Sequence, residues 1–178
     1  TDSDWSVPRS MSGGYYLMHG DHGSYIPIHT ECGMQSIAAD ASTTAEFISA
    51  HAQTKTGLRI IDALEQAGTM QDKHFELRGD NTAAESIFGK GFSCALGHLK
   101  KAIGLRVSYM HDVIERGFVR SAHIDSSLNR SNILTKPLGP LAFARERERM
   151  GVYPHRTFPS EYNERNEVGV GMQDNIKR

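Results

Sequence analysis

The spacing of apolar residues in the first part of the chain predicts a hairpin followed by a long helix. Residues 13–20 predict a strand that enters a turn at 20–23, and apolar and polar residues then alternate from 24 to 30, as in a returning strand. Between 43 and 67 the apolar positions recur every three to four residues and stop at Gly68, which is typical of an amphipathic helix.

The second part of the chain is predicted to alternate short strands with helices. In order, these are a strand at 74–78, a helix at 82–88, a long helix at 99–114, a strand at 118–124, a helix from about 129 that Pro137 breaks, and a helix from 140 to about 151. A hairpin followed by this alternation implies an α/β fold, with one mixed sheet and helices on both of its faces.

The length and composition suit a single domain with a small appendage. With 178 residues and 38% hydrophobic side chains the chain can bury a core. No apolar run approaches the roughly 18 residues of a membrane span, and no signal peptide is visible. We expect a domain over residues 1–152 and a polar, disordered tail over 153–178. Cys32 and Cys94 fit a reducing compartment, where buried free thiols are more common than disulfides.

The charges are unevenly distributed, although the formal net charge is only −1. Residues 1–89 carry 5 Lys or Arg against 12 Asp or Glu, whereas residues 90–136 carry 8 against 3. An acidic half followed by a basic segment can combine a metal site with a phosphate-contacting surface. The same distribution also suits an ordinary solvated helix face.

Four acidic residues stand where predicted elements begin or end. Asp2 and Asp4 share one face of a first strand if both are extended. Glu46 falls in the first turn of the long helix, and Asp80 lies between a strand and a helix. Ordinary structural roles are open to the last two, because Thr43-x-x-Glu46 also matches a capping box and Asp80 also suits an N-cap.

Carboxylates from a strand, a helix start and a strand end can converge at one edge of a sheet. Mg²⁺ takes oxygen ligands at about 2.0–2.1 Å, and two such ions about 4 Å apart can promote hydrolysis of a phosphodiester. Holding two divalent ions so close together requires several negative charges. The order and spacing of Asp2, Glu46 and Asp80 therefore predict a shared metal site.

Several short motifs accompany these residues over about residues 1–152. They are Asp-Ser-Asp-Trp at 2–5, Arg-Ser-Met-Ser-Gly at 9–13, Ala-Ser-Thr-Thr-Ala-Glu-Phe at 41–47, Asp-Asn at 80–81, the basic segment around Lys100-Lys101, and Ser-Asn-Ile-Leu-Thr-Lys-Pro-Leu at 131–138. Together they resemble the ribonuclease H domain of copia-type LTR retrotransposons, and the last motif is the most specific. The resemblance implies a ribonuclease-H-like fold.

The resemblance also implies a function: a metal-dependent endonuclease that hydrolyses the RNA strand of RNA–DNA hybrids within a retrotransposon-type polyprotein. It implies two Mg²⁺ ions, replaceable by Mn²⁺, held by Asp2, Glu46, Asp80 and the position of Asn132. A reverse transcriptase domain upstream, no membrane association, and an intracellular location in the cytoplasm or in virus-like particles are further expectations.

Two departures from the family pattern bear on activity. The family has a carboxylate where this chain has Asn132, whose amide oxygen can touch a metal ion but brings no charge. Only Thr1 precedes Asp2, so we expect a truncated first strand. The alternative function is a catalytically inactive ribonuclease-H-like module, retained for nucleic-acid binding or as a relic. Asp4 and Asp125 are the alternative sources of a missing carboxylate.

A hybrid substrate would be recognised by its shape, its backbone and its 2′-hydroxyls. Lys100, Lys101 and Arg106 precede the last predicted strand and are the candidates for phosphate contacts, with surface solubility as the alternative. His123 lies just before the loop that leads to Asn132. Related ribonucleases H use a loop histidine to assist product departure, so His123 is a further catalytic candidate.

One rival metal site is visible in the hairpin. His19-x₂-His22 and His29-x₂-Cys32 supply four nitrogen or sulfur ligands in pairs, as zinc sites do. The six residues between the pairs are fewer than in familiar zinc modules, and a chance clustering of histidines is the competing explanation.

Overall fold

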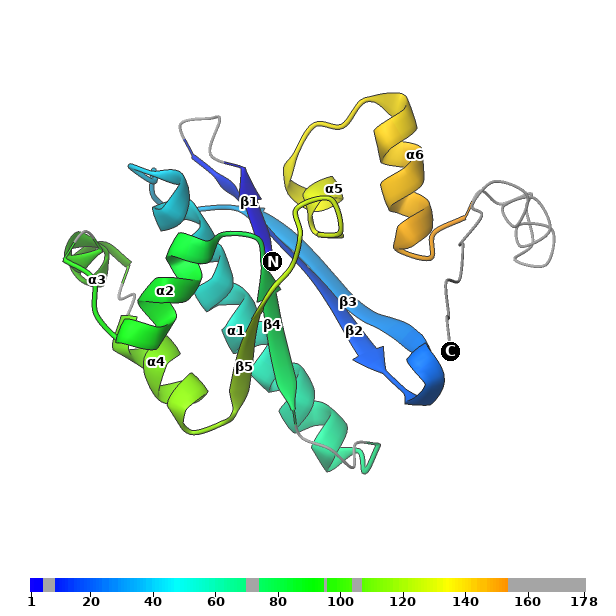
Figure 1. Cartoon of the computed structure of the whole chain (residues 1–178), viewed down its shortest axis with the longest axis horizontal. Helices are drawn as coiled ribbons and strands as arrows, with labels where there is room; N and C mark the ends of the chain where they lie inside the picture. Colours follow the sequence, from blue (N-terminus) through cyan, green and yellow to red (C-terminus); the bar gives the residue numbers. More distant parts are fainter. Residues whose placement is uncertain (5–8, 70–73, 95, 104–106, 154–178) are drawn as a thin grey trace, which may run out of the picture.

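The computed structural model describes residues 1–4, 9–69, 74–94, 96–103 and 107–153 (Figure 1). It is a mixed α/β structure, as predicted, with a three-stranded antiparallel sheet, a two-stranded parallel sheet and helices. The predicted disordered tail lies outside the described residues, except for residue 153. None of the helices in these ranges is long and apolar enough to cross a membrane.

The predicted hairpin is confirmed. Strand β2 (Met11–His19) pairs antiparallel with β3 (Tyr25–Met34), and the short 3-10 helix η1 (Asp21–Gly23) forms the turn. Away from the turn both strands extend beyond the predicted bounds, because their register continues to Met11 opposite Met34, and at the turn it ends with His19 opposite Tyr25.

Strand β1 (Asp2–Asp4) completes the antiparallel sheet on the other side of β2, with Asp2 opposite Gly13. The order is β1-β2-β3, so β1 is an edge strand in its sheet. It begins at the carboxyl end of β4 (Figure 1), where the α-amino group of Thr1 donates to the Arg78 carbonyl oxygen at 2.8 Å.

The parallel pair consists of β4 (Phe75–Gly79) and β5 (Val119–His123). The prediction of one mixed sheet is therefore wrong for the described residues. All three residues of β1 pair with β2, and among the described strands the hydrogen-bonded ladder of β4 is formed with β5 alone. The sheets meet at one corner instead of sharing a ladder.

The helices follow the predicted order. They are α1 (Ser42–Gln66), α2 (Thr82–Lys90), α3 (Gly97–Ile103), α4 (Val107–Glu115), α5 (Asn132–Thr135) and α6 (Pro140–Arg149). The segment expected to form one helix from 99 to 114 is described as two, α3 and α4, and residues 104–106 between them lie outside the described residues. The helix expected from about 129 begins later because the Asn129 carboxamide accepts from Ser131 N and donates to Thr1 O, which holds a turn there.

Helices cover both faces of the antiparallel sheet. Neighbouring residues of a strand point to opposite faces. A Cβ on Gly13 would clash with Thr135 of α5, whereas a Cβ on Gly14 would clash with Gln53 of α1. Helices α5 and α1 therefore approach the same strand from opposite sides, and glycine at both positions permits the close packing.

The hydrophobic core lies between α1, α2, α4 and the parallel strands. Phe47 of α1, Phe88 of α2 and Met110 of α4 are buried with Leu77 of β4 and Val119 of β5. Burying aromatic and aliphatic side chains of this size contributes about 1.5–3 kcal/mol each. This core fixes α1 against β4, and so fixes the start of α1 near the carboxyl end of that strand.

Candidate metal centre

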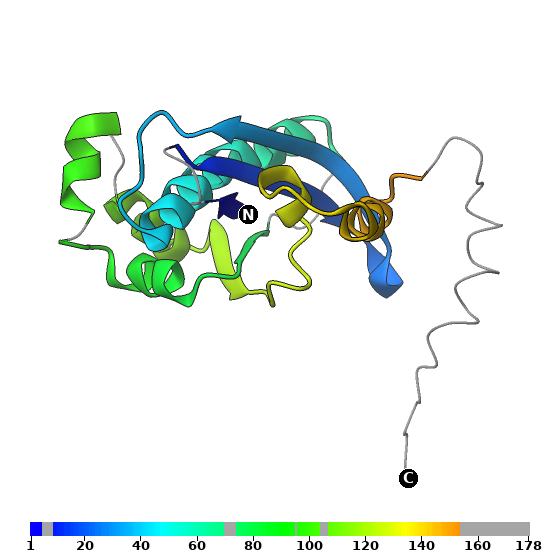
Figure 2. The ribbon, with the colours of Figure 1, turned by 90° about the horizontal axis from the view of Figure 1, so that it is seen from above.

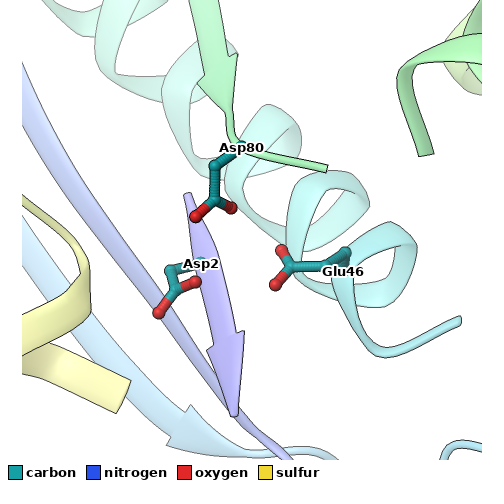
Figure 3. A group of neighbouring side chains, drawn as sticks. All are labelled: Asp2, Glu46 and Asp80. Atoms are coloured by element: carbon teal, nitrogen blue, oxygen red, sulfur yellow. The ribbon is translucent and has the colours of Figure 1, made fainter. Parts of the chain in front are cut away.

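Three carboxylates from different elements meet at the corner where the two sheets approach each other (Figure 3). Asp2 comes from β1, Glu46 from the first turns of α1, and Asp80 from the end of β4. One ligand oxygen of each lies within 4.8 Å of the others. We call these three residues the acidic cluster. Its formation is the convergence that the sequence order predicted.

Asp2 is the most enclosed member, with no exposed surface. Its Oδ2 accepts a hydrogen bond from Thr135 Oγ1, and its Oδ1 accepts one from Lys136 Nζ at 3.1 Å. Burial raises the pKa of Asp2, and the bonds from Thr135 and the charge of Lys136 oppose that shift. The carboxylate is thus held in a fixed orientation by two residues of one motif.

Glu46 is 9% exposed, and its Oε1 accepts from the Ser3 backbone N–H at 3.1 Å. Burial, and then the charges of Asp2 and Asp80, raise the pKa of Glu46 from 4.5 to about 7. Its alternative role as a helix cap is not found, because Ala41 is the N-cap of α1 and has no side-chain capping bond. The Glu46 carboxylate lies near those of Asp2 and Asp80 instead.

Asp80 is half-buried, and its Oδ2 accepts from Ser126 Oγ at 2.6 Å. The capping role considered for Asp80 belongs to the next residue. Asn81 is the N-cap of α2, and its Oδ1 accepts from Ala84 N at 3.0 Å. Asp80 is therefore free of the helix end and turns toward Asp2 and Glu46 (Figure 3).

Asn132, the predicted fourth ligand position, lies at the first residue of α5 and adjoins the acidic cluster through two bridging residues. Its Oδ1 accepts from Lys136 Nζ at 2.7 Å, and the same ammonium contacts Asp2. Its Nδ2 donates to Ser126 O at 2.7 Å, and the hydroxyl of that serine contacts Asp80. Asn132 therefore belongs to the same hydrogen-bonded network as two of the carboxylates.

The donor set suits a divalent cation of the Mg²⁺ type. Carboxylate oxygens are the ligands that Mg²⁺ prefers, and opposite oxygens of its octahedron lie about 4.2 Å apart. The observed limit of 4.8 Å requires only small side-chain adjustments or a bridging water. Buried carboxylates with raised pKa values also gain more from a cation than solvated ones do. Asp2, Glu46 and Asp80 would hold the ion.

The two alternative aspartates are placed differently. Asp4 lies two residues after Asp2 on β1. Among the described residues, the acidic cluster includes Asp2 and does not include Asp4. Asp125 is exposed in the loop after β5, where its Oδ1 accepts a hydrogen bond from Ser127 N at 2.7 Å. Hydrogen bonding to Ser127 lowers the pKa of Asp125. Neither belongs to the acidic cluster.

Exposed His123 and half-buried Glu85 form a pair near the acidic cluster. His123 ends β5 opposite Gly79, one residue before Asp80. Its Nδ1 lies 3.0 Å from Glu85 Oε1. The candidate histidine is therefore close to the acidic cluster in the fold, and Glu85 is a partner that the sequence did not indicate.

The candidate phosphate-binding lysines are remote from the acidic cluster. Lys100 and Lys101 are exposed on α3, which lies at the end of the molecule farthest from α6 in both views (Figures 1 and 2). Arg106 lies outside the described residues. Lys100 and Lys101 thus do not border the site directly.

The predicted zinc alternative does not assemble. His29 pairs with Tyr16 and Cys32 with Gly13, and these partners face opposite sides of the sheet. In the part of the chain that the structure describes, the acidic cluster is the group of three or more potential ligands that comes together. Because side chains of a strand alternate between its two faces, His29 and Cys32, which are three residues apart on β3, point to opposite faces of the sheet.

Sequence reasoning missed the residues that hold the carboxylates in place. Lys136, Thr135 and Ser126 contact Asp2 or Asp80, whereas the sequence shows Lys136 only as one of the positive charges of residues 90–136. One signal was available: Lys136 is four residues after Asn132, a spacing that places two side chains side by side on a helix.

Comparison with known proteins gives no relative to guide the assignment. No family model, curated protein or solved structure matches the chain. The chemistry of the acidic cluster therefore has to be judged from its own geometry and from the motifs of the sequence.

Replacing Glu46 with glutamine is expected to raise the free energy of unfolding near pH 8, without divalent ions, by about 1–3 kcal/mol. Because the folded pKa is raised, the folded state loses stability as the pH rises from 4.5 to about 7. Glutamine removes the buried charge but still accepts from Ser3 N. Urea unfolding of both proteins should show this difference in the free energy of unfolding near pH 8 and little difference near pH 4.5. An equal gap at both pH values would exclude the Glu46 charge as its cause.

Proposed function

We propose that this chain is a ribonuclease-H-like domain built to bind a divalent metal ion and to hydrolyse the RNA strand of RNA–DNA hybrids. The observation that carries the proposal is the approach of Asp2, Glu46 and Asp80 within 4.8 Å. They come from a first strand, the first helix and the end of a later strand, in the order that the resemblance implies. The wider expectation is a place beside a reverse transcriptase domain in a retrotransposon-type polyprotein.

The proposed reaction is attack of water on a phosphodiester. The bond between phosphorus and the 3′-oxygen breaks, the water contributes its oxygen to the 5′-phosphate, and a proton ends on the 3′-oxygen. A divalent ion bound here would polarise the phosphate and lower the pKa of the water. The chain's own residues fix three oxygens at one point, and the burial of Asp2 and Glu46 keeps bulk water from one side.

Space for substrate backbone is available next to the acidic cluster. A cleft of about 190 Å³ opens between the loop after β5 and α6, and its lining includes Asn132, Lys136 and Arg145, the last paired with the lining carboxylate of Glu146. Cationic side chains beside a carboxylate site suit the phosphates of a nucleic-acid strand. His123, which pairs with Glu85 and lies opposite Gly79, is the residue that we propose to act on the leaving group or product.

The second candidate function is an inactive nucleic-acid-binding module. It is favoured by one observation, namely that Lys136 Nζ contacts both Asp2 and Asn132 where the family pattern calls for a carboxylate. Calorimetric titration with Mn²⁺ separates the two functions. Binding that Asp80→Asn removes supports the metal-dependent enzyme, and absence of any binding supports the inactive module.

The lysines of α3 provide a test of hybrid binding away from the metal. Replacing Lys100 and Lys101 with alanine is expected to weaken hybrid binding and to reduce the log–log salt slope by roughly one per lost phosphate contact. Fluorescence anisotropy at several salt concentrations measures both effects. Lys55→Ala, an exposed lysine of α1, is the matched control. An unchanged slope would mean that Lys100 and Lys101 make no phosphate contacts and serve only the solubility of the surface.

A further inference from the structure

We propose that the ammonium group of Lys136 stands in for one of two metal ions, so that this site binds a single divalent cation. This inference rests on the proposed metal-dependent function and deepens it, because it assigns the number of ions and the residue that replaces one of them. The resemblance by itself implies two ions, and the geometry around Asn132 points to one.

The ammonium lies where a cation between two ligand positions would lie. Lys136 Nζ is 3.1 Å from Asp2 Oδ1 and 2.7 Å from Asn132 Oδ1. These are the two positions that the family pattern assigns to metal-ligating carboxylates on the first strand and the last helix. The lysine therefore joins the same pair of oxygens that a second ion would join.

The neighbouring contacts fix this arrangement. Asn132 Nδ2 donates to Ser126 O at 2.7 Å, so its amide oxygen is the atom that faces Lys136. Thr135 Oγ1 donates to the other oxygen of Asp2 and fixes the carboxylate plane. The backbone also contributes, because Lys136 N donates to Asn132 O at 3.0 Å. These three hydrogen bonds fix the oxygens of Asn132 and Asp2 and the backbone of Lys136, so that the ammonium lies between the two oxygens.

The charge balance agrees with one ion. Asp2, Glu46 and Asp80 supply three negative charges when ionised, Asn132 supplies none, and Lys136 supplies one positive charge. Two negative charges remain, which one divalent cation neutralises. A second divalent ion would give the partly buried site an excess positive charge, and an uncompensated charge is unfavourable beside buried groups such as Asp2 and Glu46.

Each carboxylate keeps room for that one ion. A carboxylate oxygen has two acceptor sites, so Asp2 Oδ1 can receive Lys136 and still bind a metal. Glu46 uses Oε1 toward Ser3 N, and Asp80 uses Oδ2 toward Ser126 Oγ. The lysine and the ion can therefore be bound together, on different sides of Asp2.

The number of bound Mn²⁺ ions tests the inference without reference to activity. Electron paramagnetic resonance counts the ions, and two ions about 4 Å apart give an exchange-coupled spectrum that one ion does not give. The measurement is made near pH 8 because the pKa of Glu46 is about 7, so that its carboxylate is then mostly ionised. The proteins are the full chain, Lys136→Met, the double variant Asn132→Asp with Lys136→Met, and the control Lys55→Met.

We expect one uncoupled ion in the full chain and in Lys55→Met. Lys136→Met should still bind one ion, roughly tenfold or more tightly, because a neighbouring positive charge is gone. The double variant should bind two coupled ions, and circular dichroism should show that it is folded. Two coupled ions in the unaltered chain, or one ion in the folded double variant, would overturn the inference and leave the metal-dependent function standing. No ion in any protein would overturn both.

Discussion

Asn132→Asp is expected to turn a weak or inactive protein into one that cleaves the RNA strand of a hybrid. The unaltered chain should show little or no cleavage, and the variant should exceed it by roughly a hundredfold or more, because a carboxylate that recruits a second ion contributes several kcal/mol to transition-state stabilisation. Gel analysis of end-labelled RNA in a hybrid, in Mg²⁺ or Mn²⁺, measures the gain.

The gain follows from the position of Asn132. Its Oδ1 faces the ammonium of Lys136, whose side chain is 39% exposed and can turn toward solvent when a cation replaces it. Aspartate adds a negative charge at this point and allows a second ion to compete with the lysine. The same RNA without its DNA strand should remain intact, because the shape of the hybrid is what such a site reads.

Two companion variants make the result specific. Asn132→Ala also breaks the contacts to Lys136 and Ser126 but adds no charge, so it should stay inactive. Adding Glu46→Gln to Asn132→Asp should abolish the gain. If Asn132→Asp is folded, binds metal and is inert, then Asn132 is not the fourth ligand position. If the unaltered chain is already fully active, Asp125 and Asp4 are the first alternatives to replace.

Asp80→Asn is expected to lower the affinity for Mn²⁺ by roughly a hundredfold or more, since it removes a negative charge from a partly buried site and leaves only a neutral amide oxygen as a ligand. Asparagine can still accept from Ser126 Oγ, so the fold should be kept. Isothermal titration calorimetry of the variant and the unaltered chain gives the ratio of dissociation constants.

Asp125→Asn is the matched control for that measurement. It makes the same chemical change in the adjacent loop, at an exposed aspartate outside the acidic cluster. Its Mn²⁺ affinity should stay within about threefold of the unaltered chain, because only a screened surface charge is lost. Equal losses in both variants would mean that the general negative charge of the region, and not the acidic cluster, attracts the ion.

Regular periodicity made much of the fold predictable. The helix expected over 43–67 is Ser42–Gln66, and Gly68 follows it with φ of 69°. The hairpin with a turn at 20–23 is confirmed, since η1 joins β2 to β3 there, and β3 contains the alternating stretch. The approach of Asp2, Glu46 and Asp80 could be expected for a related reason, since each stands at the beginning or end of an element.

Contacts between distant residues were not predictable in the same way. The arrangement of β1 depends on its ladder with β2 and on the bond from Thr1 to Arg78, and no periodic pattern encodes either. Glu46 matched a capping box, yet its carboxylate faces buried neighbours that belong to other elements. Lys136 reaches Asp2 across 134 positions of the sequence, so its charge was visible and its partner was not.

The most direct test of the metal centre is an anomalous difference map from crystals of the unaltered chain grown or soaked with Mn²⁺. We predict one peak at coordination distance, about 2.0–2.3 Å, from an oxygen of Asp2, Glu46 and Asp80, with Lys136 Nζ still beside Asp2. The absence of a peak at a fully soaked site, or a peak that none of these three carboxylates contacts, would contradict the assignment of the acidic cluster as a metal centre.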